Sequence, residues 1–317
     1  QARNWLKKVL EDKRYPKMKQ TMPQMSDGRI DTVIWNFWNR VWSQSQTEAY
    51  IKVEVHLGLT VEEERNLFSD LNDKGKKPDT GLMNNYDGSC PVNVFVGEKI
   101  IGKDGNSGVL VLTPLDKDAK KWENDSGALV RKDVNLITNM VMFGKTSRKN
   151  IKPIEVIDRS SLAIKFWTEV QKIKDFGKNG AKQKTVSAQS VVLQGIARLA
   201  FEFAFNKKEQ DTASLTRLWE EISDSTKIDF SHQEPIWRSL MLEPNRRNSE
   251  HPGIDRYVFV PAGTNLDAGT YDSANQWVRY GSKTNDIRQR VNDLVRFKLG
   301  FAPRKVVTAQ IAKAKTP

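Results

Sequence analysis

The sequence predicts an α+β protein in which a mixed N-terminal region, residues 1–113, precedes a mainly helical region, residues 114–305. Two patterns support this fold class. Ile51, Val53 and Val55 alternate with polar residues, which is the period of a half-buried strand. After Pro114, apolar residues recur at spacings of three and four, which is typical of amphipathic helices. With 317 residues and 38% hydrophobic residues, the chain can bury one large core or two ordinary ones.

A capped helix is expected directly after the strand that ends at Gly58. Thr60 is a suitable N-cap, and Glu63 three residues later completes the reciprocal pattern of a capping box. The apolar stripe of this helix ends near Leu71, and a loop with Asn72 and several lysines follows.

The rest of the N-terminal region contains three short strand candidates, at residues 91–96, 99–101 and 109–112. The glycine-rich stretch GKDGNSG lies between the last two. It lacks the Gly-Lys-Ser/Thr order and the following helix of a phosphate-binding loop, so we expect a hairpin turn there.

The helical region is predicted from six segments with helical periodicity. They are residues 116–123, 128–143, 160–173, 187–205, 212–222 and 284–299. We expect mobile or loop-rich connections at residues 172–184 and 244–270, because these stretches are rich in Gly, Lys, Pro or Asn. Residues 306–317 have low complexity and are expected to form a flexible tail.

Composition restricts the compartment and the chemistry. Cys90 is the only cysteine, so an internal disulfide is excluded and a reducing cytoplasm is expected. The three histidines are far apart in the sequence, which argues against a zinc site or a Cys-His nucleophile. No apolar run approaches the length of a membrane span, so no membrane partner is expected.

Positive charge is the strongest functional signal in the sequence. The net charge is +12, and residues 246–317 contribute 13 Lys plus Arg against 6 Asp plus Glu. A basic protein of this kind favours a polyanionic partner, with DNA as the first candidate. The candidate phosphate-binding residues fall in three clusters: Lys145, Arg148 and Lys149; Arg246 and Arg247 in a loop; and Arg288, Arg290 and Arg296 on the sides or the outer face of one helix.

The segment LTVEEERNLFSDLNDKGKKP, together with the strand before it, resembles a segment of the DGQHR-domain family, which includes the DndB-like DNA sulfur modification proteins. Upstream, where that family carries Asp-Gly-Gln-His-Arg, this chain has Asp27, Gly28 and Arg29, followed by Ile30 and Asp31. Only Asp27 and Gly28 match. The resemblance implies a small mixed-sheet core similar to ParB or sulfiredoxin within residues 1–113, a helical extension, and work on or around modified DNA.

Three functions compete. The first is a DNA-binding regulator or accessory protein of a DNA modification or defence system, with DNA and other proteins of that system, or a second copy of the chain, as partners. The second is a ParB-like nucleotide hydrolase or nuclease, whose catalytic candidates are Asp27, Asp31 and Asn72 and whose cofactor would be a nucleotide with Mg²⁺. The third is a protein-interaction module. The degraded motif, and the alternative role of Asp27 as a helix cap, favour the non-enzymatic functions.

Overall fold

The computed structural model describes residues 60, 63, 90–102, 108–111, 122–147, 150–260, 267–281 and 285–315. All of them belong to one compact unit, Leu59–Pro317. Its helices are α6 (Pro91–Phe95), α7 (Arg131–Phe143), α8 (Pro153–Val170), α9 (Ala181–Lys184), α10 (Ser190–Phe205), α11 (Thr212–Glu221), α12 (Pro244–Glu250), α13 (Asn285–Lys298) and α14 (Lys305–Lys315). Two strands, β1 (Thr270–Asp272) and β2 (Trp277–Arg279), form an antiparallel pair in which Tyr271 lies opposite Val278.

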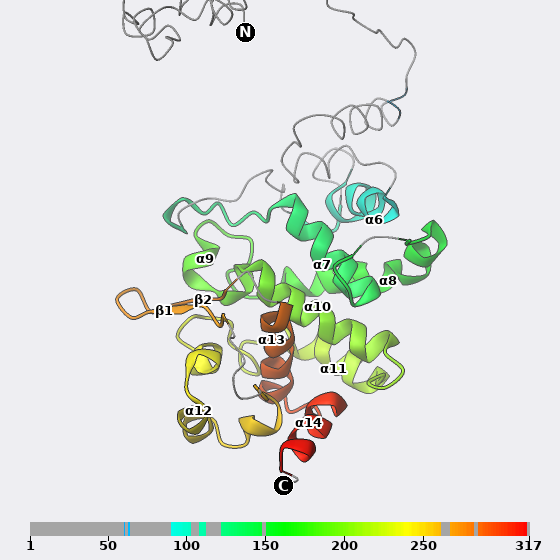
Figure 1. Ribbon diagram of the computed structural model, residues 1–317. Helices are drawn as coiled ribbons and strands as arrows, with labels where there is room; N and C mark the ends of the chain where they lie inside the picture. The colour runs from blue at the N-terminus through cyan, green and yellow to red at the C-terminus, as the bar shows by residue number, and fades with distance from the viewer. Residues whose placement is uncertain are drawn as a thin grey trace, which may run out of the picture. The chain divides into compact units, whose positions relative to one another are not determined.

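Helix α10 is the centre of the described structure. It packs against α7, α11 and α13, and in Figure 1 these helices lie around it. The sequence SVVLQGIARLAFEFAF is apolar on nearly every side, and a helix of this kind is stable in water only when neighbours cover it all round. The core of the described unit therefore forms around α10.

Gly195 allows α13 to approach α10 closely. A Cβ atom at this position would lie 2.6 Å from a side-chain methyl carbon of Val291 and 2.9 Å from the carbonyl oxygen of Arg288. Both distances are shorter than the contacts that real Cβ atoms make with other heavy atoms, so only glycine fits this helix crossing.

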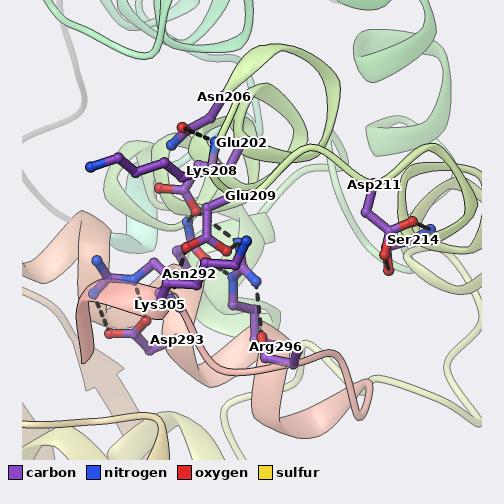
Figure 2. A network of polar contacts seen from close by, with 12 residues as sticks. Glu202, Asn206, Lys208, Glu209, Asp211, Ser214, Asn292, Asp293, Arg296 and Lys305 are labelled. Atoms are coloured by element: carbon purple, nitrogen blue, oxygen red, sulfur yellow. Dashed lines mark hydrogen bonds and ion pairs between the residues drawn. The ribbon is translucent and has the colours of Figure 1, made fainter. Parts of the chain in front are cut away.

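A buried ion pair joins the same two helices (Figure 2). Arg296 on α13 is 1% exposed, and its guanidinium lies 3.0 Å from Oε2 of Glu202 on α10. Asn292 donates to the same carboxylate at 2.9 Å and accepts from Nε of Arg296 at 3.0 Å. Burial opposes ionisation of Glu202, but Arg296, Asn292 and Arg198 outweigh it and lower the pKa of Glu202. The carboxylate is therefore charged and fully partnered inside the protein.

A second ion pair extends this polar network towards the C-terminal helix. Arg304 donates to both oxygens of buried Asp293, at 2.6 and 2.8 Å. The backbone N–H of Lys305, the first residue of α14, donates to Oε1 of Glu209 at 2.8 Å, and Glu209 also lies 3.6 Å from Arg296. Figure 2 shows Glu209 and Lys305 next to the central pair. The network thus holds α10, α13 and the start of α14 together.

The fold class is compatible with α+β, but in the described residues helices dominate and the sheet is limited to the β1–β2 hairpin. The strand expected at residues 91–96 is helical instead, in α6 and the π-helical turn Val96–Ile101, which also includes the strand expected at 99–101. Pro91 at the first helical position favours this outcome. Residues 109–111 are not a strand either: Gln171 holds them through Val109 and Val111.

Two expected loops contain ordered structure. Residues 172–184 include α9 and bury Ile173, Phe176 and Ala181 in the protein. Residues 244–270 include α12, which Pro244 starts at its first position. The tail expected at 306–317 is helical as far as Lys315, and Val307 on α14 is fully buried.

The capping box at Thr60 is confirmed. Glu63 accepts from the backbone N–H of Thr60 at 2.8 Å, and its own N–H donates to Thr60 Oγ1 at 3.3 Å. The remainder of the expected strand and helix around it, and nearly all of the ParB-like core expected in residues 1–113, lie outside the described residues. None of the described helices has both the length and the apolar character needed to cross a membrane.

The Glu202–Arg296 pair leads to a stability prediction. Replacing Arg296 by Met keeps an apolar stem but removes the guanidinium, which leaves a buried carboxylate without its main counter-charge, so the free energy of unfolding should fall by about 3 kcal/mol. Urea unfolding of the two proteins measures this. The matched control, Arg256→Met at an exposed position, should change stability by less than about 0.5 kcal/mol. Equal effects of the two changes would contradict a structural role for the pair.

Candidate nucleic-acid interface

The candidate site is a basic groove, by which we mean two adjoining cavities whose linings share Thr146 and Arg288. The larger cavity has a volume of about 490 Å³. Residues that matter for its chemistry are Trp122, Lys132, Asp133, Lys182, Ser190 and Tyr280. The smaller cavity, about 290 Å³, is lined by Lys145 and Arg198 in addition to the shared residues. Positive side chains therefore border both parts of the groove.

Arg288 reaches the groove because of the way α13 packs. Ile287, Val291 and Leu294 on this helix are fully buried against the core. Arg288 follows Ile287 directly, so it lies at the edge of the buried face and is half-buried. Burial lowers the pKa of Arg288, but a guanidinium stays protonated at neutral pH.

The backbone around Lys182 is held from two sides. Its N–H donates to Oδ2 of buried Asp125 at 2.8 Å, and its carbonyl oxygen lies 2.9 Å from Nε2 of His232. The Lys182 residue itself is 9% exposed and lines the larger cavity. Among the residues that the structure describes, it is the one buried lysine.

His232, which contacts the backbone of Lys182, is a neutral imidazole with a defined tautomer. The backbone N–H of Val278 donates to Nδ1 at 3.1 Å, so Nδ1 accepts and Nε2 carries the proton that is donated to Lys182. Burial lowers the pKa of His232, the bond to the Lys182 carbonyl opposes this, and Arg279 lowers it further. His232 thereby connects α9 to β2.

The aromatic side chain of Trp122 lines the larger cavity and contacts two other rings. The Trp122 ring lies 5.8 Å from the His232 ring and 5.6 Å from the Trp277 ring, in tilted arrangements. The Arg279 guanidinium lies 4.5 Å from the centre of the Trp122 ring, a cation–π contact. These contacts fix the orientation of Trp122 beside the larger cavity.

Two of the basic residues expected from the sequence, Lys145 and Arg288, are brought together at the smaller cavity. They belong to different predicted clusters and to distant parts of the chain. Lys145 is exposed just after α7, and Arg288 lies in the first turn of α13. Arg148 and Lys149, the other members of the first cluster, lie outside the described residues, as do Asp27, Gly28, Arg29, Asp31 and Asn72.

Arg246 and Arg247 lie in helix α12 and differ sharply in their surroundings, whereas the sequence predicts that both lie in a loop and bind phosphate. The Arg246 side chain is 67% exposed and lies 2.8 Å from Glu250. Arg247 is buried, donating to the carbonyl oxygens of Ser239 at 2.8 Å and Leu242 at 2.9 Å. Arg247 therefore stabilises the end of the 3₁₀ helix Pro235–Met241 and is not placed on the surface.

Arg290 and Arg296 on α13 also differ from the sequence expectation that both lie at the sides or outside of the helix. Arg296 is buried in the ion pair with Glu202. The Arg290 side chain is 11% exposed and lies 3.7 Å from Asp293. Both arginines act inside the protein in this structure, because carboxylates from the core are close enough to balance their charge.

Most groove residues are absent from the sequence-based candidates, among them Trp122, Lys132 and Lys182. Lys182 lies in the Gly- and Lys-rich stretch that suggests a mobile linker, and nothing in its spacing indicates that it is buried. Lys132 is the second residue of α7, whose amphipathic pattern is visible in the sequence. Among the described residues, no group of three or more His, Cys, Asp or Glu side chains could hold a metal ion.

Fold and groove together define a mainly helical protein with a basic cavity between the starts of α7, α10 and α13. A family model described as DndB, DNA-sulfur modification-associated, matches residues 43–258, more than half of the chain. The chain belongs to the DndB family, which associates it with DNA sulfur modification. The match includes Trp122, Lys132, Lys145 and Lys182, whereas Arg288 lies beyond it. Comparisons with curated proteins and with solved structures found no match.

The two arginines of α12 allow a direct test of their different roles. Arg247→Met should lower the free energy of unfolding by about 1–3 kcal/mol, because two buried carbonyl groups lose a charged donor. Arg246→Met should change it by less than about 1 kcal/mol, as expected of an exposed ion pair. Chemical denaturation of both variants measures the two changes in the free energy of unfolding. Similar changes in the two variants would show that Arg247 is not structural.

His232 should make the protein sensitive to acid. Its pKa in the folded state is lowered from 6.5, so the unfolded chain binds more protons between the two values. The contribution of His232 to stability should be complete above about pH 6.5 and should be lost as the pH falls through the lowered value. We expect His232→Gln to be less stable at pH 7.5 but to lose less stability between pH 7.5 and 5 than the wild type. Thermal unfolding across this range measures the difference, and parallel curves would exclude the effect.

Proposed function

We propose that this DndB-family protein is a regulatory or accessory component of a DNA sulfur modification system, and that it contacts the DNA phosphate backbone through the basic groove. The observation that carries the proposal is the convergence of Lys132, Lys145 and Arg288 on one groove, although they come from α7, from the segment after α7 and from α13.

The charges of the groove suit a phosphate backbone. Lys132 and Lys145 are exposed, so both can follow phosphates without a desolvation cost. Arg288 supplies a planar guanidinium, which can bind a phosphate through two parallel hydrogen bonds. Phosphate contacts of this kind give affinity and position but carry no sequence information. A regulator that binds DNA of many sequences depends on phosphate contacts of this kind for its affinity.

The enzyme hypothesis receives less support. In the groove the cations are combined with a single carboxylate, Asp133. The catalytic candidates Asp27, Asp31 and Asn72 lie outside the described residues, so the comparison concerns the groove alone. A nuclease or nucleotide hydrolase that depends on Mg²⁺ usually places several oxygen ligands around the ion. The basic groove resembles a binding surface more than such a centre.

DNA binding should be steeply dependent on salt. Each phosphate that the protein neutralises should contribute about −0.9 to the slope of log affinity against log salt concentration. In the double variant Lys132→Ala with Lys145→Ala, the slope should become shallower by about two, with weaker binding on all DNA sequences alike. Fluorescence anisotropy with labelled duplex DNA at several salt concentrations measures this.

The matched control is Lys207→Ala with Lys227→Ala, which removes the same charge from exposed positions that line neither cavity. Its slope should equal that of the wild type. A wild-type affinity that does not change with salt would refute DNA binding through phosphates. Equal losses in the two double variants would show that the net charge acts and that the groove does not.

A further inference from the structure

We propose that the larger cavity of the basic groove holds a single nucleotide unit, with its phosphate near Lys182 and Arg288 and its base against Trp122. The inference rests on the proposed function, since it specifies what the DNA-binding groove recognises. The nucleotide is either free in solution or an unpaired position of a DNA strand, and in both cases a phosphate meets the cations and a base meets the indole ring.

The size of the cavity suits one nucleotide. Cavities that bind small molecules usually measure about 300–1,000 Å³, and this one measures about 490 Å³. Stacked base pairs of a double helix do not fit such a volume. A duplex can therefore contact only the rim of the groove, whereas a base outside a stack can enter the cavity.

The charges of the lining match a phosphate group. Lys132, Lys182 and Arg288 carry three positive charges and Asp133 carries one negative charge, which leaves a net charge of two. The phosphate monoester of a free nucleotide carries about −1.5 to −2 at neutral pH, and a phosphodiester within a strand carries about −1, so the lining can balance either anion. Lys182 is buried beside the cavity, where its attraction to an anion is screened less than at the surface.

The start of α10 adds a second contribution to anion binding. Its N-cap residue, Gln189, makes no side-chain bond to the helix, because its amide joins the Val278 carbonyl and the Tyr280 N–H of the hairpin segment, both at 2.9 Å. Gln189, Ser190 and Val191 all line the cavity. The positive end of a 16-residue helix thus opens onto the same space as the three cations.

Trp122 supplies the surface for a base. It is half-buried, lines the cavity, and is held in place by Trp277 and Arg279. A fixed indole ring can stack on any base, because every base has an aromatic face. Thr146, Ser190 and Gln194 on the same lining offer polar groups for the sugar or the edge of the base. The cavity therefore combines an anion site with an aromatic surface.

The test compares four probes by isothermal titration calorimetry on the full chain: dAMP, deoxyadenosine, inorganic phosphate and a short single-stranded oligonucleotide. We expect dAMP to bind more tightly than either deoxyadenosine or phosphate. Binding of the oligonucleotide without binding of dAMP would assign the site to nucleotides within a strand, and binding of dAMP as well would include free nucleotides. Failure of both dAMP and the oligonucleotide to bind would overturn the inference.

Variants separate the two halves of the site. Lys182→Met should weaken dAMP and phosphate by about tenfold or more, because it removes the buried charge and keeps the stem. Trp122→Leu should weaken dAMP by about tenfold or more and leave phosphate unchanged. Trp219→Leu and Lys227→Met, which change residues outside the cavity lining, serve as matched controls and should bind like the wild type. Unchanged binding of dAMP to both cavity variants would also overturn the inference.

Folding and the proposed function are checked separately. Thermal unfolding identifies any variant that fails to fold. Lys132→Ala, at an exposed position, then takes the place of that variant, and we expect it to bind dAMP and phosphate more weakly than the wild type. Salt-dependent duplex binding without nucleotide binding would refute the cavity inference and keep the proposed function. Nucleotide binding without duplex binding would refute the proposed function alone.

Discussion

The buried ion pair between Glu202 and Arg296 determines how α10 and α13 pack, and most of the described structure depends on that contact. Two charges inside a protein are costly unless each has a full set of partners, and here Asn292 and Arg198 complete the set. A small rotation of α13 would break these bonds together. The pair therefore fixes one orientation of α13, and Arg288, two turns earlier on the same helix, is directed to the groove as a result.

The long helices were predictable because their apolar faces repeat over several turns. The segments predicted at 128–143, 187–205 and 284–299 correspond closely to α7, α10 and α13. Short segments were not predictable in the same way. Val92, Val94 and Val96 alternate and are β-branched, which favours a strand, but Pro91 starts a helix there. For a run of six residues, both periods fit the pattern equally well.

The candidate site was predictable only in part, because a sequence shows which residues are charged and does not show where their charges are balanced. Lys145 and Arg288 line the same cavity, and their contact with phosphate stays a prediction. Arg296 has the same helical spacing as an exposed arginine, and its burial depends on Glu202, which is 94 positions away in the chain. The role of Arg247 likewise depends on carbonyl groups at the end of a preceding 3₁₀ helix.

The long separation between α10 and α13 has a consequence for biosynthesis. Ribosomes add about 5–20 residues each second, so the 94 residues that follow Glu202, up to and including Arg296, take roughly 5–20 seconds to synthesise. During that interval α10, with its apolar surface and its buried carboxylate, has no α13 to cover it. The nascent chain must keep this helix from aggregating or hold it on α7 and α11, and the native core can close only when α13 has left the ribosome.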